Sequence, residues 1–521
     1  MIAVILLLGA IALIYYAIIK PFRYWANKNV QTGDIWPLIK VNIEGLLGTT
    51  SVFEMTRKFY NNIQGGRYVG IYQFNTPVLL LKSPDIIKQL CVRDADYFLD
   101  HGILFVGDTT DLWTKNILML KGQHWKNVRG ALSPCYTSSK MKSMFNLMCK
   151  TAEQHAEYFA KQGGEIIEVE LKDALTRFTN DIIANTAFGI EVDSLVDRKN
   201  EFYVMLRKST NFADPWMKFA ISLYQFYPNV AKLFKVKIFP EKVDHFFLNL
   251  VKDTIKFREE QKIKRSDMIG LLIEAKHGQQ KEIQTEEASV GEAKEQQKNE
   301  NNFELTDFDI ASQVFIFFFS GFESVSSSMC FTAHELASNP DVQRRLIEEI
   351  DENRTASGTP TYEAICNMTY LDMVVKEIMR KYPIIIATDR VVTKPYTIEP
   401  KLPGEKPVHL EPGENVLIPI MAIHYDPKNF ENPDKFDPER FSPENKKDMD
   451  PYSYIPFGVG PRNCIGYRFA ILEIKVIIFY LLSYFEIVPV EKTNIPVKLC
   501  KEDLNLASEN GFPLGLRRRI L

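Results

Sequence analysis

Residues 456–466 read Pro-Phe-Gly-Val-Gly-Pro-Arg-Asn-Cys-Ile-Gly, a loop that holds a single cysteine among three glycines. A cysteine thiolate that binds a metal needs backbone N–H groups directed at its sulfur, because these hydrogen bonds and the local burial set the metal's redox potential. The glycines give the backbone the freedom that such a loop requires. A helical run follows at residues 467–484, and its N-terminal dipole would favour an anionic sulfur at Cys464. The pattern therefore predicts that Cys464 binds a metal as a thiolate.

Arg462, two residues before the cysteine, indicates which kind of cofactor carries the metal. Its guanidinium has the fork geometry that pairs with a carboxylate such as a haem propionate. With the pattern Phe-x-x-Gly-x-Arg-x-Cys-x-Gly, the loop resembles the haem-binding signature of the cytochrome P-450 family, the haem-thiolate monooxygenases. This resemblance implies haem b with Cys464 as its axial ligand, and cofactor contacts from Phe457, Gly458, Arg462 and Gly466. The alternative, a buried free cysteine that packs as a small hydrophobe, is the default for the other six cysteines.

Three further side chains match family positions that contact the haem propionates. Trp125 and Arg129 resemble its Trp-x-x-x-Arg segment, although a pair spaced by four residues is also an ordinary neighbour pair on one helix face. Arg390 aligns with a later arginine that contacts a propionate. The resemblance therefore implies that Trp125, Arg129 and Arg390 bind the cofactor together with the cysteine loop.

Glu377, Arg380 and Arg440 match two other elements of the family, Glu-x-x-Arg and Pro-x-Arg-Phe. Glu377 and Arg380 share a helix face, because they are three residues apart. Arg440 could complete a buried network, which must be fully paired to be tolerated. The implied role of the network is structural, in that it holds the cysteine loop.

The sequence predicts a long helix over residues 305–339, which the family uses to activate oxygen. The family reads Ala/Gly-Gly-x-Asp/Glu-Thr-Thr at its centre, and here Gly321, Glu323 and Ser324 occupy the matching positions, with serine in place of threonine. Gly321 would let the helix lie close to the haem, while the Ser324 hydroxyl can bond the Ser320 carbonyl and open the helix locally. Because bound O₂ needs protons at its outer oxygen, Glu323 and Ser324 form a predicted relay. A buried helix with a polar kink is the alternative.

The chain of 521 residues is long enough for a large core, with 45% apolar and 12% aromatic residues. The matched motifs are scattered along it yet must meet around one cofactor, so residues 46–521 are predicted to form a single catalytic domain. A net charge of −3 gives no sign of nucleic-acid binding. The periodicity predicts a mostly helical α+β domain, as the family has. Helices are expected at residues 138–162, 169–188 and 364–381, and strands at residues 77–81, 391–398 and 414–419.

The first residues have the composition of a membrane anchor. Residues 1–19 contain no charged side chain, and roughly 20 apolar helical residues span a bilayer. Lys20, Arg23 and Lys28 follow, so the positive-inside rule places the catalytic domain in the cytosol. A secretory signal peptide is the alternative, but the segment lacks a basic start and a small-residue cleavage site. In a eukaryotic cell, which the family's anchored members imply, this single-pass anchor lies in the endoplasmic reticulum membrane (microsomes), with residues 20–45 as a linker.

Two segments and a set of apolar positions bear on the substrate. Residues 276–302 are rich in Gln, Glu, Lys and Asn and are predicted to form a mobile surface loop. Residues 202–247 carry many aromatic side chains among lysines, which suits helices that cover a pocket and dip into lipid, with core packing as the alternative. An apolar pocket favours bulky apolar substrates bound by desolvation. The family's substrate positions match Ile103, Phe105, Phe212, Phe315, Phe318, Phe319, Ile384, Ile385, Ile386 and Phe512.

The overall likeness is to the drug-metabolising microsomal branch of the family: insect families nine and six and animal family three. It is carried by residues 132–134, 316–323, 339–343, 370–375 and 460–466, and the long polar loop leans toward insect family nine. The branch implies a monooxygenase of the unspecific type that inserts one atom of O₂ into xenobiotics such as plant toxins or insecticides. Electrons would come from NADPH through a separate NADPH–cytochrome reductase, with cytochrome b5 as an optional second donor.

The partner surface and the reaction class leave alternatives open. A basic patch of Lys126, Arg129 and Arg468 is a candidate site for the acidic reductase, with a solvated charged face as the alternative. A haem-thiolate isomerase or dehydratase would need no reductase, and such relatives typically lose the acid–hydroxyl pair that Glu323 and Ser324 retain. A non-catalytic haem sensor would keep the cysteine loop but would consume no NADPH when given reductase and substrate.

Overall fold

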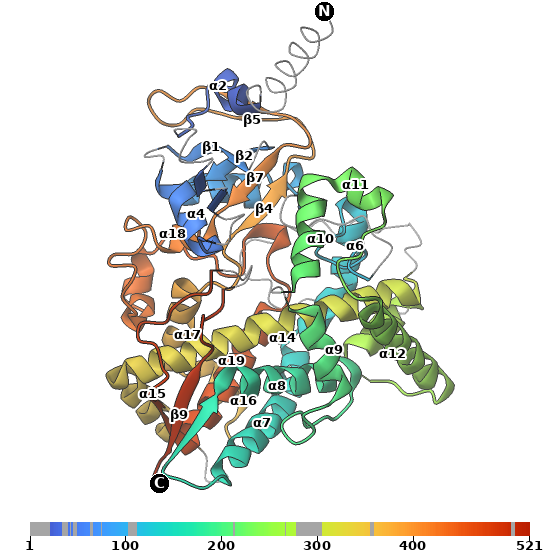
Figure 1. Cartoon of the computed structure of the whole chain (residues 1–521), viewed down its shortest axis with the longest axis vertical. Helices are drawn as coiled ribbons and strands as arrows, with labels where there is room; N and C mark the ends of the chain where they lie inside the picture. Colours follow the sequence, from blue (N-terminus) through green and yellow to red (C-terminus); the bar gives the residue numbers. More distant parts are fainter. Residues whose placement is uncertain are drawn as a thin grey trace, which may run out of the picture.

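The computed structural model describes residues 21–33, 40, 41, 43, 44, 49–62, 66–73, 76–102, 112–211, 214–265, 267–277, 305–354, 359–501 and 506–520. Helices dominate these residues, and a sheet lies toward the upper end of the view (Figure 1). The longer helices are α4 Val52–Asn61, α6 Gly122–Leu132, α7 Ser138–Ala160, α8 Leu171–Ile183, α9 Glu201–Ser209, α10 Pro215–Phe226, α12 Glu241–Glu260, α13 Met268–Lys276, α14 Asp307–Ser338, α15 Pro340–Glu352, α17 Thr369–Lys381 and α19 Tyr467–Tyr484.

Shorter helical turns connect them. Two of these turns, η3 and η6, are π-helical. The short elements are η2 Pro21–Arg23, α2 Tyr24–Asn27, α5 Pro84–Lys88, η3 Gln89–Arg93, η4 Ala95–Tyr97, η5 Ser133–Tyr136, η6 Ala184–Phe188, α11 Pro228–Leu233, α16 Tyr362–Asn367, α18 Ile420–His424, η7 Pro438–Phe441, η8 Asn445–Asp448 and η9 Gly460–Arg462.

The described strands form three small sheets with the orders β1-β2-β7-β4, β3-β9-β8 and β5-β6. All pairs are antiparallel except β2 with β7, in which Leu79 lies opposite Val416. The strand predicted at residues 391–398 is wrong as one element, because it is divided between β4 and β5; Pro395 lies between them and has no N–H for a ladder. The strands are β1 Tyr68–Gln73, β2 Thr76–Leu81, β3 Ile166–Glu170, β4 Thr388–Val391, β5 Tyr396–Ile398, β6 Val408–Leu410, β7 Asn415–Ile418, β8 Phe485–Pro489 and β9 Pro513–Arg518.

Helix α14 crosses the middle of the molecule and packs against α8, α12 and α19 (Figure 1). It starts with a capping box, in which Thr306 accepts from the Asp309 N–H and Asp309 accepts from the Thr306 N–H. It ends at Ser338 before Pro340, close to the predicted bounds. Among the described helices it is the one long and apolar enough to cross a membrane, and most of that apolar stretch is buried inside the protein. Burial on nearly all sides explains its apolar composition.

Part of the predicted linker packs against the domain. Trp25 in α2 is buried, and its indole N–H donates to the Ile71 carbonyl of β1, N···O 3.0 Å. A Cβ on Gly70 would lie 2.3 Å from the Trp25 ring, so this contact requires glycine in the strand. Residues 21–33 therefore follow the sheet closely, whereas the predicted anchor at residues 1–19 lies outside the described residues, as does most of the predicted polar loop 276–302.

Candidate functional site

A cavity of about 660 Å³ lies between α14, α6 and the cysteine loop. Most of its lining is apolar, and its polar groups gather at the loop and at the centre of α14. All of the predicted site residues except Arg390 line it: Trp125, Arg129, Gly321, Glu323, Ser324, Phe457, Gly458, Arg462, Cys464 and Gly466.

The cysteine loop is shaped by its glycines. Gly458 and Gly460 have φ values of 73° and 74°, which side chains with a Cβ rarely adopt. A Cβ on Gly460 would lie 1.8 Å from the Cys91 carbonyl oxygen, so the loop can pack on η3 only with glycine at this position. The Cys464 N–H donates to the Phe457 carbonyl, N···O 2.8 Å, which closes the loop immediately before α19.

Cys464 is surrounded by protein, yet its side chain is exposed to the cavity. Burial raises the pKa of its thiol, while a hydrogen bond from the Gly466 N–H and the charge of Arg129 act in the opposite direction. The neutral thiol is therefore favoured in the absence of a metal. A metal cation that binds the sulfur would displace the proton and stabilise the thiolate. The arrangement suits a buried metal ligand.

Arg462 and Arg129 form a cationic edge of this cavity beside Trp125. The Arg462 guanidinium lies 4.0 Å from the centre of the Trp125 ring and donates to the carbonyls of Leu99 and Leu120, N···O 2.7 Å each. Its nearest carboxylate is Asp100, at 3.3 Å, and burial lowers the pKa of Arg462 to about 9. An anionic ligand group at this edge would therefore be stabilised, as the haem propionates require.

Arg129 is directed at the loop itself. Its two terminal nitrogens donate to the Asn463 carbonyl at 2.9 Å and to the Asn463 side-chain oxygen at 2.6 Å. Arg390, by contrast, does not line the cavity: it donates to the Val459 carbonyl at 3.2 Å and to the Asp389 carbonyl at 2.7 Å. Arg129 thus bonds the backbone of the loop after Arg462, and Arg390 bonds it before Arg462. Arg390 therefore contacts the loop rather than the cavity.

His101 joins this group although no motif predicted it. It lines the cavity, and its Nδ1 lies 3.0 Å from both the Asp389 carbonyl and the Asp389 carboxylate. Two acceptors at one nitrogen mean that Nδ1 carries the proton. Burial lowers the pKa of His101, against the effect of Asp389, so the ring is neutral. The only signal for it in the sequence was its position before Trp125, close to the predicted substrate positions Ile103 and Phe105.

The centre of α14 has the predicted polar groups on the cavity wall. The Ser324 hydroxyl donates to the Ser320 carbonyl, as expected, but α14 remains α-helical throughout, so no break accompanies this bond. A Cβ on Gly321 would lie 2.8 Å from the Ile183 side chain, which makes the glycine a packing site for α8. Gly321 thus lets α8 approach α14 closely at the cavity.

Glu323 has a partner that sequence reasoning missed. Its carboxylate lies 2.7 Å from the ammonium of Lys172 at the start of α8, and each side chain is 18% exposed. Lys172 also donates to the hydroxyls of Ser326 and Ser327, N···O 3.0 and 2.8 Å. The lysine therefore fixes the orientation of the carboxylate at the edge of the cavity.

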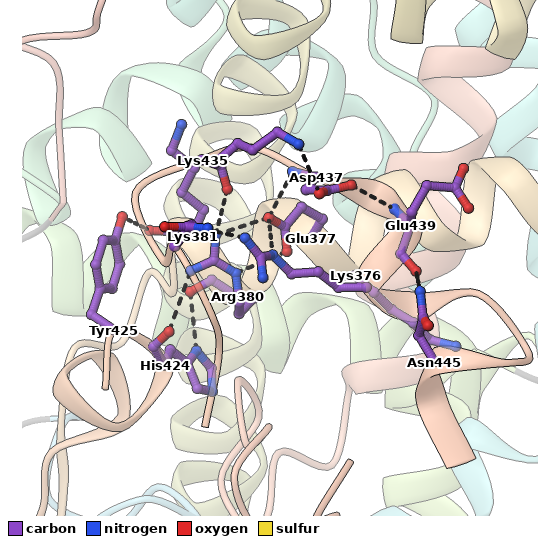
Figure 2. A network of polar contacts seen from close by, with 12 residues as sticks. Lys376, Glu377, Arg380, Lys381, His424, Tyr425, Lys435, Asp437, Glu439 and Asn445 are labelled. Carbon is purple, nitrogen blue, oxygen red and sulfur yellow. Dashed lines mark hydrogen bonds and ion pairs between the residues drawn. The ribbon is translucent and has the colours of Figure 1, made fainter. Parts of the chain in front are cut away.

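Figure 2 shows the network of Glu377 and Arg380, both on α17. Two parallel hydrogen bonds of 2.8 Å join the pair, and both side chains are fully buried. Arg440 completes the predicted trio with its Nε 3.4 Å from Glu377, and the Asp437 N–H donates to the same carboxylate at 2.9 Å. The three side chains therefore meet as predicted and tie α17 to η7, while their role in holding the cysteine loop stays a prediction.

The predicted substrate positions divide into three groups. Phe319, Ile384, Ile385 and Ile386 line the cavity. Phe315, Phe318 and Phe512 were wrong, because all three are buried in the hydrophobic core and do not line the cavity. Additional aromatic lining comes from Trp113, Tyr224, Phe239 and Phe317, whereas Ile103, Phe105 and Phe212 lie outside the described residues.

The helical fold and a cysteine loop that opens onto the cavity are the features expected of a haem-thiolate protein. Comparison with known proteins agrees, because the family model for Cytochrome P450 matches residues 37–513. The chain is 42% identical to cytochrome P450 9e2 of Blattella germanica over 512 residues, which cover 95% of this chain and 94% of that protein. It is 40% identical to a protein of Drosophila melanogaster named probable cytochrome P450 9f2 (92% of both chains) and 36% identical to cytochrome P450 6k1 of Blattella germanica (96% and 94%).

The chain therefore belongs to the cytochrome P450 family and is similar to insect members of families 9 and 6. Its cofactor is haem, held by a cysteine thiolate as throughout this family. The residues present fit haem, because the exposed Cys464 and a cationic edge suited to two propionates line the same apolar cavity.

Proposed function

We propose that this protein is a membrane-anchored monooxygenase that inserts one oxygen atom of O₂ into apolar substrates. One observation carries the proposal: a single cavity is lined by Cys464, by the cationic edge of Arg129 and Arg462, and by Glu323 and Ser324. A haem ligand, a place for the propionates and a proton donor pair thus share one space. Cys464 is the proposed axial ligand.

When bound, haem with a thiolate ligand activates O₂ and favours cleavage of its O–O bond. The residues of the chain then have distinct tasks. Arg129 and Arg462 orient the propionates through the cationic edge, while the apolar walls exclude water. The Ser324 hydroxyl donates to the Ser320 carbonyl, so its oxygen can accept a hydrogen bond from a group in the cavity, and Glu323 lies one residue away on the same wall. We assign to this pair the task of passing protons beside the cavity.

Replacing Ser324 by alanine is expected to waste reducing equivalents. The variant keeps the helix but loses the cavity hydroxyl, so proton delivery slows and more of the NADPH electrons would end in peroxide; general acid–base groups contribute about 10²–10⁴-fold to such steps. The ratio of product to NADPH consumed should fall at least several-fold while peroxide rises. Ser312→Ala is the matched control, because that hydroxyl bonds a carbonyl of the same helix, that of Phe308, and does not line the cavity. Unchanged coupling in Ser324→Ala would remove Ser324 from the relay.

Replacing Lys172 by methionine is expected to lower the same coupling. Without the ammonium 2.7 Å away, the Glu323 carboxylate loses the contact that orients it at the edge of the cavity. The ratio of product to NADPH consumed should fall several-fold, whereas Lys172→Arg should restore most of it. Equal coupling in wild type and in Lys172→Met would show that the ion pair has no part in proton delivery.

We expect bulky apolar substrates, because aromatic and aliphatic side chains make up most of the cavity wall. Together with the likeness to insect families 9 and 6, this favours xenobiotics such as plant toxins or insecticides. Ile384, Ile385 and Ile386 follow α17 on one wall and would contact such ligands by desolvation.

Residues 1–19 are the proposed anchor in the endoplasmic reticulum membrane. An exposed apolar patch on α10 and α11 supports a membrane-facing role for this part of the domain, because large exposed apolar surfaces mark contacts with lipid or protein. The patch consists of Trp216, Phe219, Tyr227, Val230, Leu233 and Phe234.

The proposed electron donor is a separate NADPH–cytochrome reductase, with cytochrome b5 as an optional second donor. Lys126 and Arg468 are exposed on the side of the cysteine loop and fit an acidic partner. Arg129 fits this surface less well, because its guanidinium is bonded to Asn463 inside the loop.

The experiment that tests the function combines detergent-solubilised protein, reductase, NADPH and ¹⁸O₂ with a bulky apolar substrate. A product that contains one ¹⁸O atom and requires the reductase supports a monooxygenase. Conversion of an already oxygenated substrate without reductase would identify an isomerase or dehydratase instead. Binding of substrate without NADPH consumption in the complete mixture would identify a sensor.

A further inference from the structure

His424 connects the Glu377–Arg380 network to the cysteine loop. It ends α18, is completely buried, and faces Arg380 in Figure 2. Its Nδ1 lies 3.2 Å from the Arg380 carbonyl oxygen, and the Arg380 guanidinium donates back to the His424 carbonyl at 3.3 Å. On the other side, the Ile455 N–H donates to His424 Nε2, N···N 3.0 Å. One imidazole thus contacts both the network and the residue that precedes the loop.

The contacts of the ring fix its protonation. The Ile455 amide can only donate, so Nε2 must accept and cannot carry a proton. Nδ1 therefore carries the proton and donates to the Arg380 carbonyl. Burial and the nearby charge of Arg380 lower the pKa of His424 to about 3, so the neutral form persists over the whole range in which the protein would work.

Ile455 passes the contact on to the loop. Its carbonyl accepts from the Gly458 N–H, N···O 3.0 Å, and the carbonyl of Phe457 accepts from the Cys464 N–H. The Tyr454 ring stacks on the His424 ring at 5.6 Å with an interplanar angle of 20°, so the imidazole cannot tilt freely. A continuous series of hydrogen bonds and packing contacts thus leads from the buried network to the proposed haem ligand.

We propose that His424 is a positioning residue that holds the Cys464 loop in the shape that keeps the thiolate on the haem iron. The inference rests on the proposed role of Cys464 and assigns a task to a side chain that touches neither cavity nor cofactor. If His424 lost its bond to Ile455, a buried N–H would be left unpaired next to the turn at Gly458. The loop would then release its sulfur more readily than the rest of the fold unfolds.

Two substitutions separate the two bonds of the ring. His424→Gln places an amide oxygen near the position of Nε2 and can still accept from Ile455, whereas His424→Asn reaches only the position of Nδ1 and can still bond the Arg380 carbonyl. The measurement follows, over time at one fixed urea concentration, the strongly red-shifted Soret band of the reduced, carbon monoxide-bound protein, alongside helix content by circular dichroism. In His424→Asn the band should be lost about ten-fold faster than in wild type while the helices remain, and His424→Gln should recover most of the difference.

His334 provides the matched control, because it is another buried histidine, bonded through Nε2 to the Asn494 carbonyl at 2.8 Å. In His334→Asn the band and the helix signal should disappear together. The inference is overturned if His424→Asn behaves in this way, or if His424→Gln loses the band as fast as His424→Asn. A wild-type protein without the red-shifted band would instead reject the proposed role of Cys464, so the two failures are distinguishable.

Discussion

Replacing Cys464 by serine is expected to abolish the strongly red-shifted Soret band of the dithionite-reduced, carbon monoxide-bound protein. The shift requires a thiolate that donates electron density to iron, and a neutral serine hydroxyl cannot supply it. Because the thiolate also favours O–O cleavage, the variant should show no detectable NADPH-dependent product. The measurement is the absorption spectrum of both proteins in detergent.

Cys366→Ser is the control for this experiment, because Cys366 is exposed on α16 and does not line the cavity. That variant should retain the wild-type band. A wild-type spectrum typical of histidine-ligated haem, unchanged in Cys464→Ser, would contradict both the ligand assignment and the proposed mechanism.

Replacing Arg380 by leucine is expected to lower the free energy of unfolding by about 3–5 kcal/mol, because it leaves the Glu377 carboxylate buried without its bidentate partner. Such a loss is a large share of the stability of a typical domain, so haem incorporation should fall as well. Urea unfolding followed by circular dichroism measures the first effect, and haem content per protein measures the second.

Arg517→Leu is the matched control, because Arg517 pairs with Glu486 at the surface, where both side chains are almost half exposed. An exposed ion pair contributes about 0–1 kcal/mol, so this variant should unfold close to wild type. Equal losses in the two variants would mean that the buried network does not stabilise the fold more than a surface pair does.

Local sequence was sufficient where a short pattern has one structural solution. The helix after the cysteine loop spans Tyr467–Tyr484, as predicted, and the 23-residue α7 begins at the predicted Ser138. Glu377 and Arg380 form their pair because three residues on a helix place both side chains on one face. The glycines at 458 and 460 also follow from local geometry, because few other residues adopt their φ values.

The helix predicted at residues 364–381 shows where this local reasoning ends. It is divided into α16 and α17 at Met368, whose backbone is extended. The Glu349 carboxylate of α15 accepts from the N–H groups of Tyr370 and Leu371, both at 2.8 Å, and so caps the second helix. A carboxylate about 20 residues away in the chain decides this boundary, and no periodicity within the segment indicates it.

The sequence by itself determined the family, the cysteine loop, the central helix and the residue types that surround the cofactor. Only the tertiary structure revealed that Lys172 pairs with Glu323, that His101 joins the cationic edge and that His424 lies between Arg380 and Ile455. The physical reason is distance along the chain: Lys172 and Glu323 are 151 residues apart. Periodicity and capping report on neighbours within a few turns, whereas such contacts arise only when separate helices pack around one core.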